Sequence, residues 1–276
     1  MDILVEMNQI LPGKKLTMSS RFFEQQSITI NHKVILSEEN SHKIISVLKL
    51  PIGSIITIFN NTNTEFTAKI TELKIFKNKK NNKLIEIEIL KATTNNLESP
   101  LKIHLVQAIA KNDNMDLIIQ KAVELGVHQV TPIITERTIV KIATNQITKK
   151  IDHWQSIAIN ACCQCGRNII PKVNPALVFN DFIKNNFFNK FILSPTIKFL
   201  KDGQKLQMDL AKEIILLIGP EGGFSNKEME LAVQNQYLPI NIGPRVLRTE
   251  TASLVALSIF QYQYGDLNKN DNYSLR

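Results

Sequence analysis

Two glycine-punctuated segments decide the fold of the C-terminal half of the chain: Ile218-Gly219-Pro220-Glu221-Gly222-Gly223-Phe224-Ser225 and Ile242-Gly243-Pro244-Arg245-Val246-Leu247-Arg248-Thr249-Glu250-Thr251-Ala252. Each segment follows a short apolar run and leads into a stretch with helical character. Two such strand-to-helix turns place two glycine loops along one edge of a sheet, and that edge is where open α/β sheets bind ligands. Glycine lets the backbone approach a ligand closely. These loops therefore predict a site for a nucleotide-like cofactor.

A capping-box pattern, Ser225-Asn226-Lys227-Glu228, follows the first loop. The serine hydroxyl is expected to accept from the Glu228 N–H while the glutamate side chain reaches back, so the box fixes where the helix starts and, with it, the preceding loop. The loop has neither the lysine of a Walker motif nor the spacing of a GxGxxG turn. A triphosphate or dinucleotide site is therefore disfavoured, and simple connecting turns are the alternative to a cofactor site.

Expected strands and helices alternate from Leu101 onward. Asp113 and Gly126 are the expected start and end signals of the first helix. Alternation of this kind predicts a mostly parallel sheet covered by helices on both faces. The expected strands are 101–108, 127–134, 191–193 and 214–218, and the expected helices are 114–125 and 149–166.

The N-terminal third is expected to consist mostly of short strands. The run Ile85-Glu86-Ile87-Glu88-Ile89 alternates with period two, which is typical of a strand with one buried face. Several short strands around one helix predict a small β-barrel. The strands are expected at 28–30, 34–36, 55–59, 66–70 and 84–90, and the helix at 38–48. The expected parts of the chain are a β-barrel domain at 1–92, a linker at 93–100, an α/β domain at 101–266 and a polar tail at 267–276.

The chain has 276 residues and a net charge of +8, with lysine and arginine in excess. Such an excess attracts polyanions and favours a nucleic-acid partner, although a lysine-rich and asparagine-rich composition is the alternative cause. The three cysteines lie close together, at Cys162, Cys163 and Cys165. Their spacing suits neither a disulfide nor a zinc site, and no apolar run reaches membrane-spanning length. The sequence therefore predicts a reduced, cytoplasmic protein without a metal and without a membrane segment.

The order GPEGGFS and then GPRVLRTETA resembles the signature of the 16S ribosomal RNA uracil-N3 methyltransferases, which belong to the knotted SPOUT class of enzymes. Upstream segments 107–111 and 120–127 match the pattern of that family as well. The likeness covers about residues 20–262 of the chain. The chain departs from the family at four positions, with Lys49 and Ser54 in place of arginine and aspartate and with Asn160 and Cys163 in place of glutamates.

The resemblance implies a fold, a cofactor and partners. The fold would be an N-terminal RNA-binding β-barrel of the PUA or OB type and a C-terminal α/β domain with a trefoil knot. The chain would act as a homodimer on 16S ribosomal RNA or on the small ribosomal subunit. Three loops would hold S-adenosylmethionine, through Leu193, Ser194, Pro195, Ile218, Gly219, Pro220, Gly222, Gly223, Ile242, Gly243, Val246 and Leu247.

With this resemblance, uracil chemistry suggests roles for charged residues beside these loops. Arg248 would stabilise negative charge on the uracil oxygens as an oxyanion hole does. Glu221 would take the N3 proton as general base, with solvent as the competing proton acceptor, or it would act electrostatically at the sulfonium of the cofactor. A loop-bracing ion pair, for example between Arg248 and Glu250, is the alternative. The expected RNA contacts are Arg21, Arg137, Lys141, Gln164, Arg167 and Arg245.

Simpler interpretations exist for two of the expected RNA contacts. Gln164 and Arg167 share a helix face that could simply face solvent, and the phenylalanines beside Arg21 could belong to the core. Two functions compete with uracil methylation. One is ribose 2′-O-methylation of RNA within the same fold class, and the other is a non-catalytic RNA-binding factor for ribosome assembly.

Overall fold

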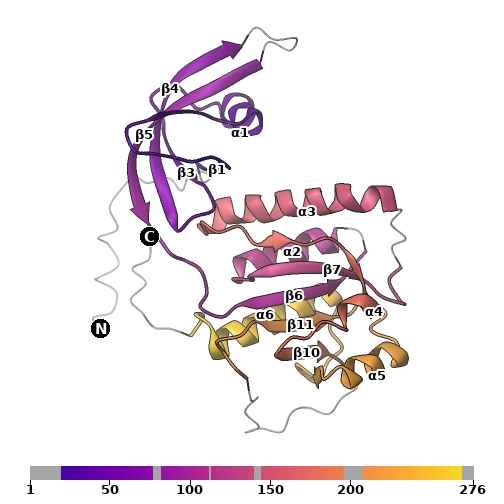
Figure 1. Ribbon diagram of the computed structural model, residues 1–276. Helices are drawn as coiled ribbons and strands as arrows, with labels where there is room; N and C mark the ends of the chain where they lie inside the picture. The colour runs from indigo at the N-terminus through magenta and orange to yellow at the C-terminus, as the bar shows by residue number, and fades with distance from the viewer. Residues whose placement is uncertain (1–19, 77–81, 112, 140–143, 196–207, 269–276) are drawn as a thin grey trace, which may run out of the picture. The chain divides into compact units, whose positions relative to one another are not determined.

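The computed structural model of the protein describes residues 20–76, 82–111, 113–139, 144–195 and 208–268. The chain divides into two compact units (Figure 1). The first contains residues up to 94 except 61–63, and the second contains residues 61–63 and the chain from 95 onward.

The first unit is a five-stranded sheet with one helical segment. Its strands are ordered β1-β3-β4-β5-β2, with β1 parallel to β3 and the other neighbours antiparallel. The helix expected at 38–48 is confirmed as α1 continued by the π-helical segment η2. The elements are β1 (Arg21–Phe23), β2 (Lys33–Ile35), α1 (Glu38–His42), η2 (Lys43–Leu48), β3 (Ile55–Phe59), β4 (Thr64–Phe76) and β5 (Asn82–Thr94).

Side chains connect the two end strands of this sheet. The Glu24 carboxylate, directly after β1, accepts hydrogen bonds of 2.9 Å from both the backbone N–H and the hydroxyl of Ser37. Gln26 donates to the carbonyl of Ile35 in β2 at 3.1 Å. Over the described residues the strand order ends at β1 and β2, so closure into the expected barrel is not confirmed.

One strand expectation in this unit is wrong, and one strand was not expected. Residues 28–30 are not a strand, and β1 forms instead around Phe22, which is buried in the core. A three-residue strand is too short to show the period-two signal in the sequence. The alternation around Ile87 was a better guide, because Ile85, Ile87 and Ile89 all lie in the core of this unit.

The second unit contains the parallel sheet that was expected. The sheet order is β12-β10-β11-β6-β7-β8, with β9 also pairing with β7, and every pairing is parallel. The elements are β6 (Ile103–Ala108), α2 (Asn114–Glu124), β7 (Gln129–Ile134), α3 (Thr144–Cys165), β8 (Lys172–Val173), β9 (Leu177–Val178), α4 (Phe179–Phe182), β10 (Asn189–Leu193), β11 (Ile214–Ile218), α5 (Asn226–Gln234), β12 (Leu238–Ile240) and α6 (Thr249–Tyr264).

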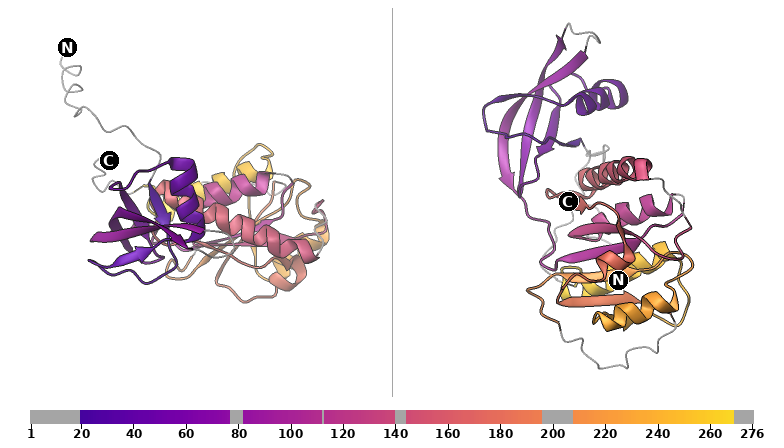
Figure 2. Two further views of the ribbon diagram at one scale, coloured as in Figure 1. Left: turned by 90° about the horizontal axis from the view of Figure 1, so that it is seen from above. Right: turned by 45° about the vertical axis from the view of Figure 1, so that its right-hand side comes forward.

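Helices cover both faces of this sheet (Figure 2). On one face α2 and α6 pack together, and the Phe191 ring of β10 lies 5.2 Å from the Phe260 ring of α6. On the other face α4 and α5 bury Phe179 and Ala232 against Val106 and Leu217. Since side chains alternate along a strand, Leu105 and Gln107 of β6 face the α6 side.

The end signals of α2 were predicted in part. Gly126 has φ +77°, which suits the glycine that follows a helix end. Asp113 occupies the cap position but makes no capping hydrogen bond with its side chain, so that expectation is wrong. Its carbonyl accepts the first bond, from the Leu117 N–H at 3.0 Å.

The cysteines are free thiols, and burial raises the pKa of the Cys162 thiol. Over the described ranges the structure contains no cluster of histidine, cysteine and acidic residues suited to a metal ion. A search of the same ranges finds no helix long and apolar enough to span a membrane.

Candidate cofactor pocket and its surroundings

The residues directly after β10, Ser194 and Pro195, meet the loops that follow β11 and β12 around one cavity of about 380 Å³. Every residue expected to bind the cofactor lines this cavity except Gly243. Glu221 and Arg245 line it as well. The structure therefore brings together three loops that are distant in sequence, at the carboxyl ends of parallel strands where open α/β sheets bind ligands. Residues of the lining that the sequence did not indicate are Phe224, Asn226, Met229, Ile240, Asn241, Thr249 and Ala252.

The first glycine loop folds tightly on itself. The Gly223 N–H donates to the Pro220 carbonyl at 2.8 Å, and Gly223 has φ +66°, a conformation that side chains disfavour. A Cβ added at Gly219 would lie 3.3 Å from the Gly223 backbone and from the Phe224 ring. The capping box then begins α5 as predicted, with Ser225 and Glu228 bonded reciprocally.

Two side chains tie this loop to neighbouring strand ends. The Glu221 carboxylate accepts from the Lys111 N–H at 2.8 Å, just beyond β6. Arg137, just beyond β7, donates through Nη1 to the Gly222 carbonyl at 2.9 Å. A Cβ added at Gly222 would lie 3.4 Å from the Cβ of Arg137, so the Arg137 side chain occupies the space beside this glycine. Arg137, expected to contact RNA, thus lines the cofactor pocket.

The other two loops are bonded to each other. The Ser194 N–H donates to the Ile240 carbonyl at 3.0 Å, and Asn241 Nδ2 donates to the Pro195 carbonyl at 3.3 Å. The Asn241 side chain also accepts from the Gly243 N–H at 3.0 Å, and Gly243 has φ +149°. Gly243 therefore contributes to the conformation of the third loop, although it does not line the pocket.

Arg248 lies exposed directly before α6, the last residue before the helix begins. The nearby Glu250 carboxylate accepts from Asn114 Nδ2 at 3.4 Å. Within the described part of the chain no ion pair joins Arg248 to Glu250, which does not favour the loop-bracing alternative. Next to it, Arg245 is exposed and Val246 is 85% exposed, so this loop presents both charge and apolar surface at the rim of the pocket.

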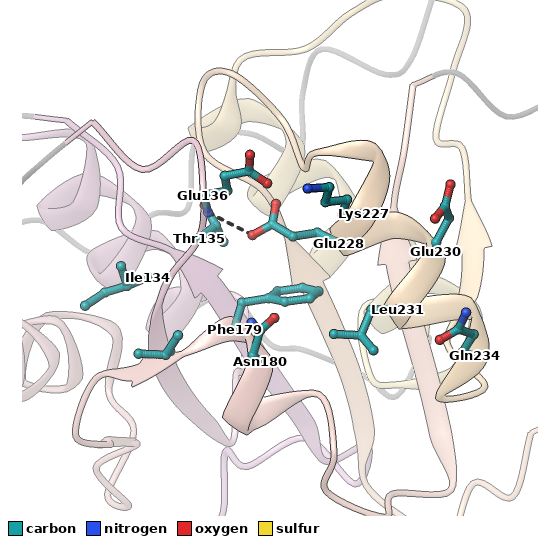
Figure 3. Close-up of a pocket in the computed structure, with 11 residues that line it drawn as sticks. Ile134, Thr135, Glu136, Phe179, Asn180, Lys227, Glu228, Glu230, Leu231 and Gln234 are labelled. Carbon is teal, nitrogen blue, oxygen red and sulfur yellow. Dashed lines mark hydrogen bonds between the residues drawn. The ribbon is translucent and has the colours of Figure 1, made fainter.

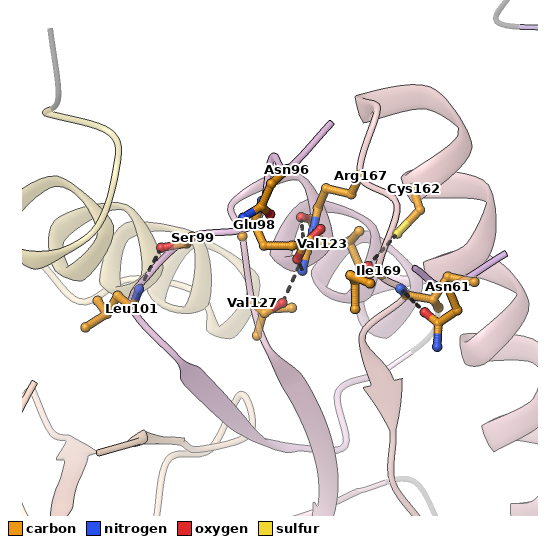
Figure 4. Close-up of polar contacts among 12 residues, drawn as sticks. Asn61, Asn96, Glu98, Ser99, Leu101, Val123, Val127, Cys162, Arg167 and Ile169 are labelled. Atoms are coloured by element: carbon orange, nitrogen blue, oxygen red, sulfur yellow. Dashed lines mark hydrogen bonds and ion pairs between the residues drawn. The ribbon is translucent and has the colours of Figure 1, made fainter. Parts of the chain in front are cut away.

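Arg167 corrects an expected RNA contact. Its side chain is buried, 5% exposed, and forms an ion pair with Glu98 (Figure 4). Nη1 also donates to the carbonyls of Val123 and Val127 at 2.9 and 3.0 Å, where α2 ends. This guanidinium holds a helix end inside the second unit, and it is not available to RNA in this structure.

The remaining expected RNA contacts have different surroundings. The Arg21 guanidinium is paired with Glu65 at 2.6 Å and lies 4.9 Å from the centre of the Phe59 ring. Gln164 is exposed on α3, consistent with either a contact or a solvent-facing helix surface. Lys141 lies outside the described residues.

A second cavity, of about 570 Å³, lies between α5, the end of β7 and the start of α4 (Figure 3). Its lining combines Glu136, Glu228 and Glu230 with apolar side chains such as Phe179 and Leu231. The Glu228 carboxylate is occupied, because it accepts from the N–H groups of Glu136 and Ser225, each at 2.8 Å. The cavity contains neither glycine loop, so we assign the cofactor to the other one.

Comparison with known proteins agrees with this geometry. A family model described as the RNA methyltransferase domain matches residues 97–261. A protein of Buchnera aphidicola (subspecies Acyrthosiphon pisum), named ribosomal RNA small subunit methyltransferase E, is 40% identical over 249 residues, or 89% of this chain and 94% of that protein. The chain belongs to the ribosomal RNA small subunit methyltransferase E family. The member of this family from Bacillus subtilis is 30% identical over 83% of this chain and 89% of its own length.

Solved structures of similar proteins contain the cofactor that the resemblance implied. Ribosomal RNA small subunit methyltransferase E of Neisseria gonorrhoeae was solved bound to S-adenosylmethionine, with 32% identity, a TM-score of 0.79 and coverage of 90% of this chain and 99% of that one. A methyltransferase of Legionella pneumophila, solved in complex with the same cofactor, is 40% identical to this chain with a TM-score of 0.83. The match covers 91% of this chain and 100% of that one. This chain therefore has the same α/β fold as these solved methyltransferases.

Proposed function

We propose that this protein methylates N3 of a uridine in 16S ribosomal RNA. Membership of the family makes the chain an S-adenosylmethionine-dependent methyltransferase of small-subunit ribosomal RNA. The uridine and its N3 atom are our own assignment. The observation that carries the assignment is the position of Arg248, which is exposed and stands between two residues of the lining, Leu247 and Thr249, although it is not itself part of that lining. In the described ranges it forms no ion pair with an acidic side chain.

The pocket fits S-adenosylmethionine in size and chemistry. Its volume of about 380 Å³ falls within the range of small-molecule sites. Leu193, Ile218, Ile242 and Leu247 supply apolar walls for an adenine, and the glycine loop adds backbone groups for hydrogen bonds. When bound, the cofactor supplies a methyl group on a sulfonium, and the carboxylate of Glu221 is the acidic side chain of the lining that suits a positive charge.

Uridine N3 carries a proton, and it becomes nucleophilic only as that proton leaves. The resulting negative charge spreads onto O2 and O4 of the base. Arg248 can stabilise this charge through its planar set of donors. The start of α6 adds to the effect, because Arg248 is its N-cap residue and makes no capping hydrogen bond with its side chain, so the positive end of the helix lies beside this arginine. After the proton has left, N3 would bond to the methyl carbon while the bond from that carbon to the sulfonium sulfur breaks. The electron pair of the broken bond would stay on sulfur, and the base would again be neutral.

Glu221 is our candidate for the group that receives the proton. Its side chain lines the pocket, and one oxygen is held by the Lys111 N–H at 2.8 Å while the residue itself is exposed. A carboxylate held in this way keeps one oxygen for substrate. Solvent is the competing proton acceptor. The Glu221→Gln variant separates the two acceptors, because it removes the carboxylate but leaves solvent in place. A slower methyl-transfer rate in this variant would support Glu221, and an unchanged rate would support solvent.

The architecture around the site supports further proposals. The crossing of the chain from β11 over β10 to β12 is consistent with a trefoil knot. The exposed Val246 beside the pocket is consistent with a second copy of the chain completing a homodimer.

The five-stranded first unit is our candidate for an RNA-binding barrel domain, with the assembled small subunit as substrate in the cytoplasm. The net charge of +8 predicts that RNA affinity falls steeply with salt.

Mass spectrometry of 16S RNA nucleosides, from cells with and without the gene, tests the proposal. Loss of 3-methyluridine in the deletion strain is the expected result. Loss of a ribose-methylated nucleoside would support the 2′-O-methyltransferase alternative, and an unchanged nucleoside profile would support a non-catalytic assembly factor.

A further inference from the structure

A chain of buried side chains connects the centre of the sheet to the cofactor pocket. It begins at Gln107 in β6, which is fully buried and faces α6. Gln107 Oε1 accepts from the Ser253 hydroxyl at 2.6 Å, and Gln107 Nε2 donates to Thr249 Oγ1 at 3.0 Å. The Thr249 hydroxyl then donates to the Gly219 carbonyl at 2.6 Å.

The direction of these hydrogen bonds is fixed by the number of protons. Thr249 has one hydroxyl proton, and the short bond to the Gly219 carbonyl requires it, because a carbonyl can only accept. Thr249 must therefore accept from its other neighbour. The amide nitrogen of Gln107 meets that requirement, and its second proton is directed to the Ala108 carbonyl at 2.9 Å.

The buried network joins two segments on which the site depends. Gly219 opens the first glycine loop, and Thr249 is the first residue of α6, immediately after Arg248. A shift of either segment would leave a buried donor or acceptor without a partner, and such groups are costly in a protein interior. The network thus couples the position of the pocket to the position of the arginine beside it.

We propose that Gln107 and Thr249 are positioning residues that set the glycine loop against α6 and thereby shape the cofactor pocket. The proposal rests on the proposed cofactor site and not on the uridine chemistry. Its direct consequence is that removing the Thr249 hydroxyl weakens S-adenosylmethionine binding even when no RNA is present.

The chain provides a matched control for this test. Thr131 in β7 is also a buried threonine, 2% exposed against 4% for Thr249. Its hydroxyl also makes two hydrogen bonds, to His104 Nε2 at 2.7 Å and to Asn174 Nδ2 at 2.9 Å, and it does not line the pocket. Thr131→Val and Thr249→Val therefore remove the same group from equally buried positions.

Calorimetry with S-adenosylmethionine and thermal unfolding are measured on the full-length protein for Thr131→Val, Thr249→Val and Thr249→Ser. We expect both valine variants to melt at lower temperature than the wild type. Only Thr249→Val should lose cofactor affinity, by about tenfold, which corresponds to about 1.4 kcal/mol. Thr249→Ser keeps the hydroxyl and should restore most of the affinity.

Gln107→Glu tests the direction of the network. A carboxylate cannot donate, so the Thr249 hydroxyl would turn to it and release the Gly219 carbonyl. Burial raises the pKa of an introduced carboxyl, and its protonated form can donate again. Cofactor affinity of this variant should therefore improve as the pH falls, relative to the wild type measured at the same pH values.

The outcomes separate this inference from the proposed function. If the wild type does not bind S-adenosylmethionine, the proposed site fails and the inference fails with it. If the wild type binds but Thr249→Val binds equally well, or if Thr131→Val loses as much affinity, the positioning role is wrong while the proposed function stands. If Gln107→Glu fails to fold, Gln107→Met takes its place, because Gln107 lies outside the lining of the pocket whereas Thr249 is part of it. Normal cofactor affinity in a folded Gln107→Met protein would contradict the positioning role.

Discussion

The guanidinium of Arg137 donates a hydrogen bond of 2.9 Å to the carbonyl of Gly222, although 85 residues separate the two in the chain. Arg137 follows β7 and Gly222 belongs to the loop after β11, so the bond bridges two strand ends across the intervening strand β6. The residue that looked like a phosphate contact in the sequence therefore holds the glycine loop in place.

Arg137→Met should weaken S-adenosylmethionine binding by about fivefold. The variant removes one hydrogen bond to the loop, which is worth about 1 kcal/mol on average. Calorimetry without RNA measures the effect, and Arg137→Lys should recover only part of it. If Arg137→Met binds the cofactor normally and instead lowers the salt dependence of RNA binding, the residue contacts phosphate as the sequence suggested.

Gly223→Ala should weaken cofactor binding through backbone strain alone. Gly223 has φ +66° with open space where a side chain would stand, so the cost is conformational, about 1–2 kcal/mol. Gly53→Ala is the matched control, because Gly53 has φ +92° and equally open space in the other unit. Unfolding experiments should show a similar loss of stability for the two alanine variants. Calorimetry should show a loss of cofactor affinity only for Gly223→Ala. If Gly223→Ala bound the cofactor as tightly as the wild type does, the conformation of the glycine loop would have no role in cofactor binding.

Arg248→Ala should slow methyl transfer by about 10²–10³-fold, or about 2.7–4 kcal/mol, with little change in cofactor affinity. The reason is that the arginine stabilises charge that develops in the transition state. Single-turnover kinetics at saturating cofactor measures the step, and Arg248→Lys should recover only part of the rate because lysine lacks the planar fork. An unchanged methyl-transfer rate in the alanine variant would end the catalytic assignment.

Arg167→Met should lower the free energy of unfolding by about 3 kcal/mol. Removing one partner of a buried ion pair costs at least this much, and the value lies at the low end because the Glu98 side chain is partly exposed. Urea unfolding measures the loss. Gln164→Ala, three residues earlier at the exposed end of α3, is the control, since an exposed position should change stability by no more than about 0.5 kcal/mol. A stable Arg167→Met protein with weakened RNA binding would restore the RNA-contact interpretation.

Acid should destabilise the first unit through Glu86. Hydrogen bonds from Lys74 and Lys33 hold the pKa of this carboxyl below its ordinary value of 4.5. A lowered folded-state pKa means that the stabilisation is fully present above pH 4.5 and is lost as the pH falls through the folded-state value. The stability difference between wild type and Glu86→Gln should therefore be largest above that pH and shrink below it. A stability difference between the two proteins that does not change with pH in the same unfolding series would contradict this role of Glu86.

The sequence predicted the second unit better than the first. Glycine loops after apolar runs carry local signals, so the strand ends near Ile218 and Ile242 and the capping box at Ser225 could be located without a structure. The strand around Phe22 is three residues long and is held by β3, far along the chain. Its formation depends on tertiary pairing, which short-range patterns do not contain.

The charged residues show the same limit. A guanidinium looks alike in a sequence whether it faces RNA, as proposed for Arg248, or is buried against carbonyls, as Arg167 is. Thr249 carried no signal either, since a threonine at a helix start is common for capping reasons. Its role becomes visible only when Gln107 and Gly219 are seen within hydrogen-bond distance of it.

The bond between Gln107 and Thr249 spans 142 residues and also bears on how the enzyme is made. Synthesis runs from the N-terminus, so a nascent chain that ends at Arg248 has all three loops but lacks the hydroxyl that holds the first of them. Such a chain leaves the amide of Gln107 and the carbonyl of Gly219 unpaired. If the network positions the loop as proposed, the cofactor pocket is complete only once α6 has docked on the sheet.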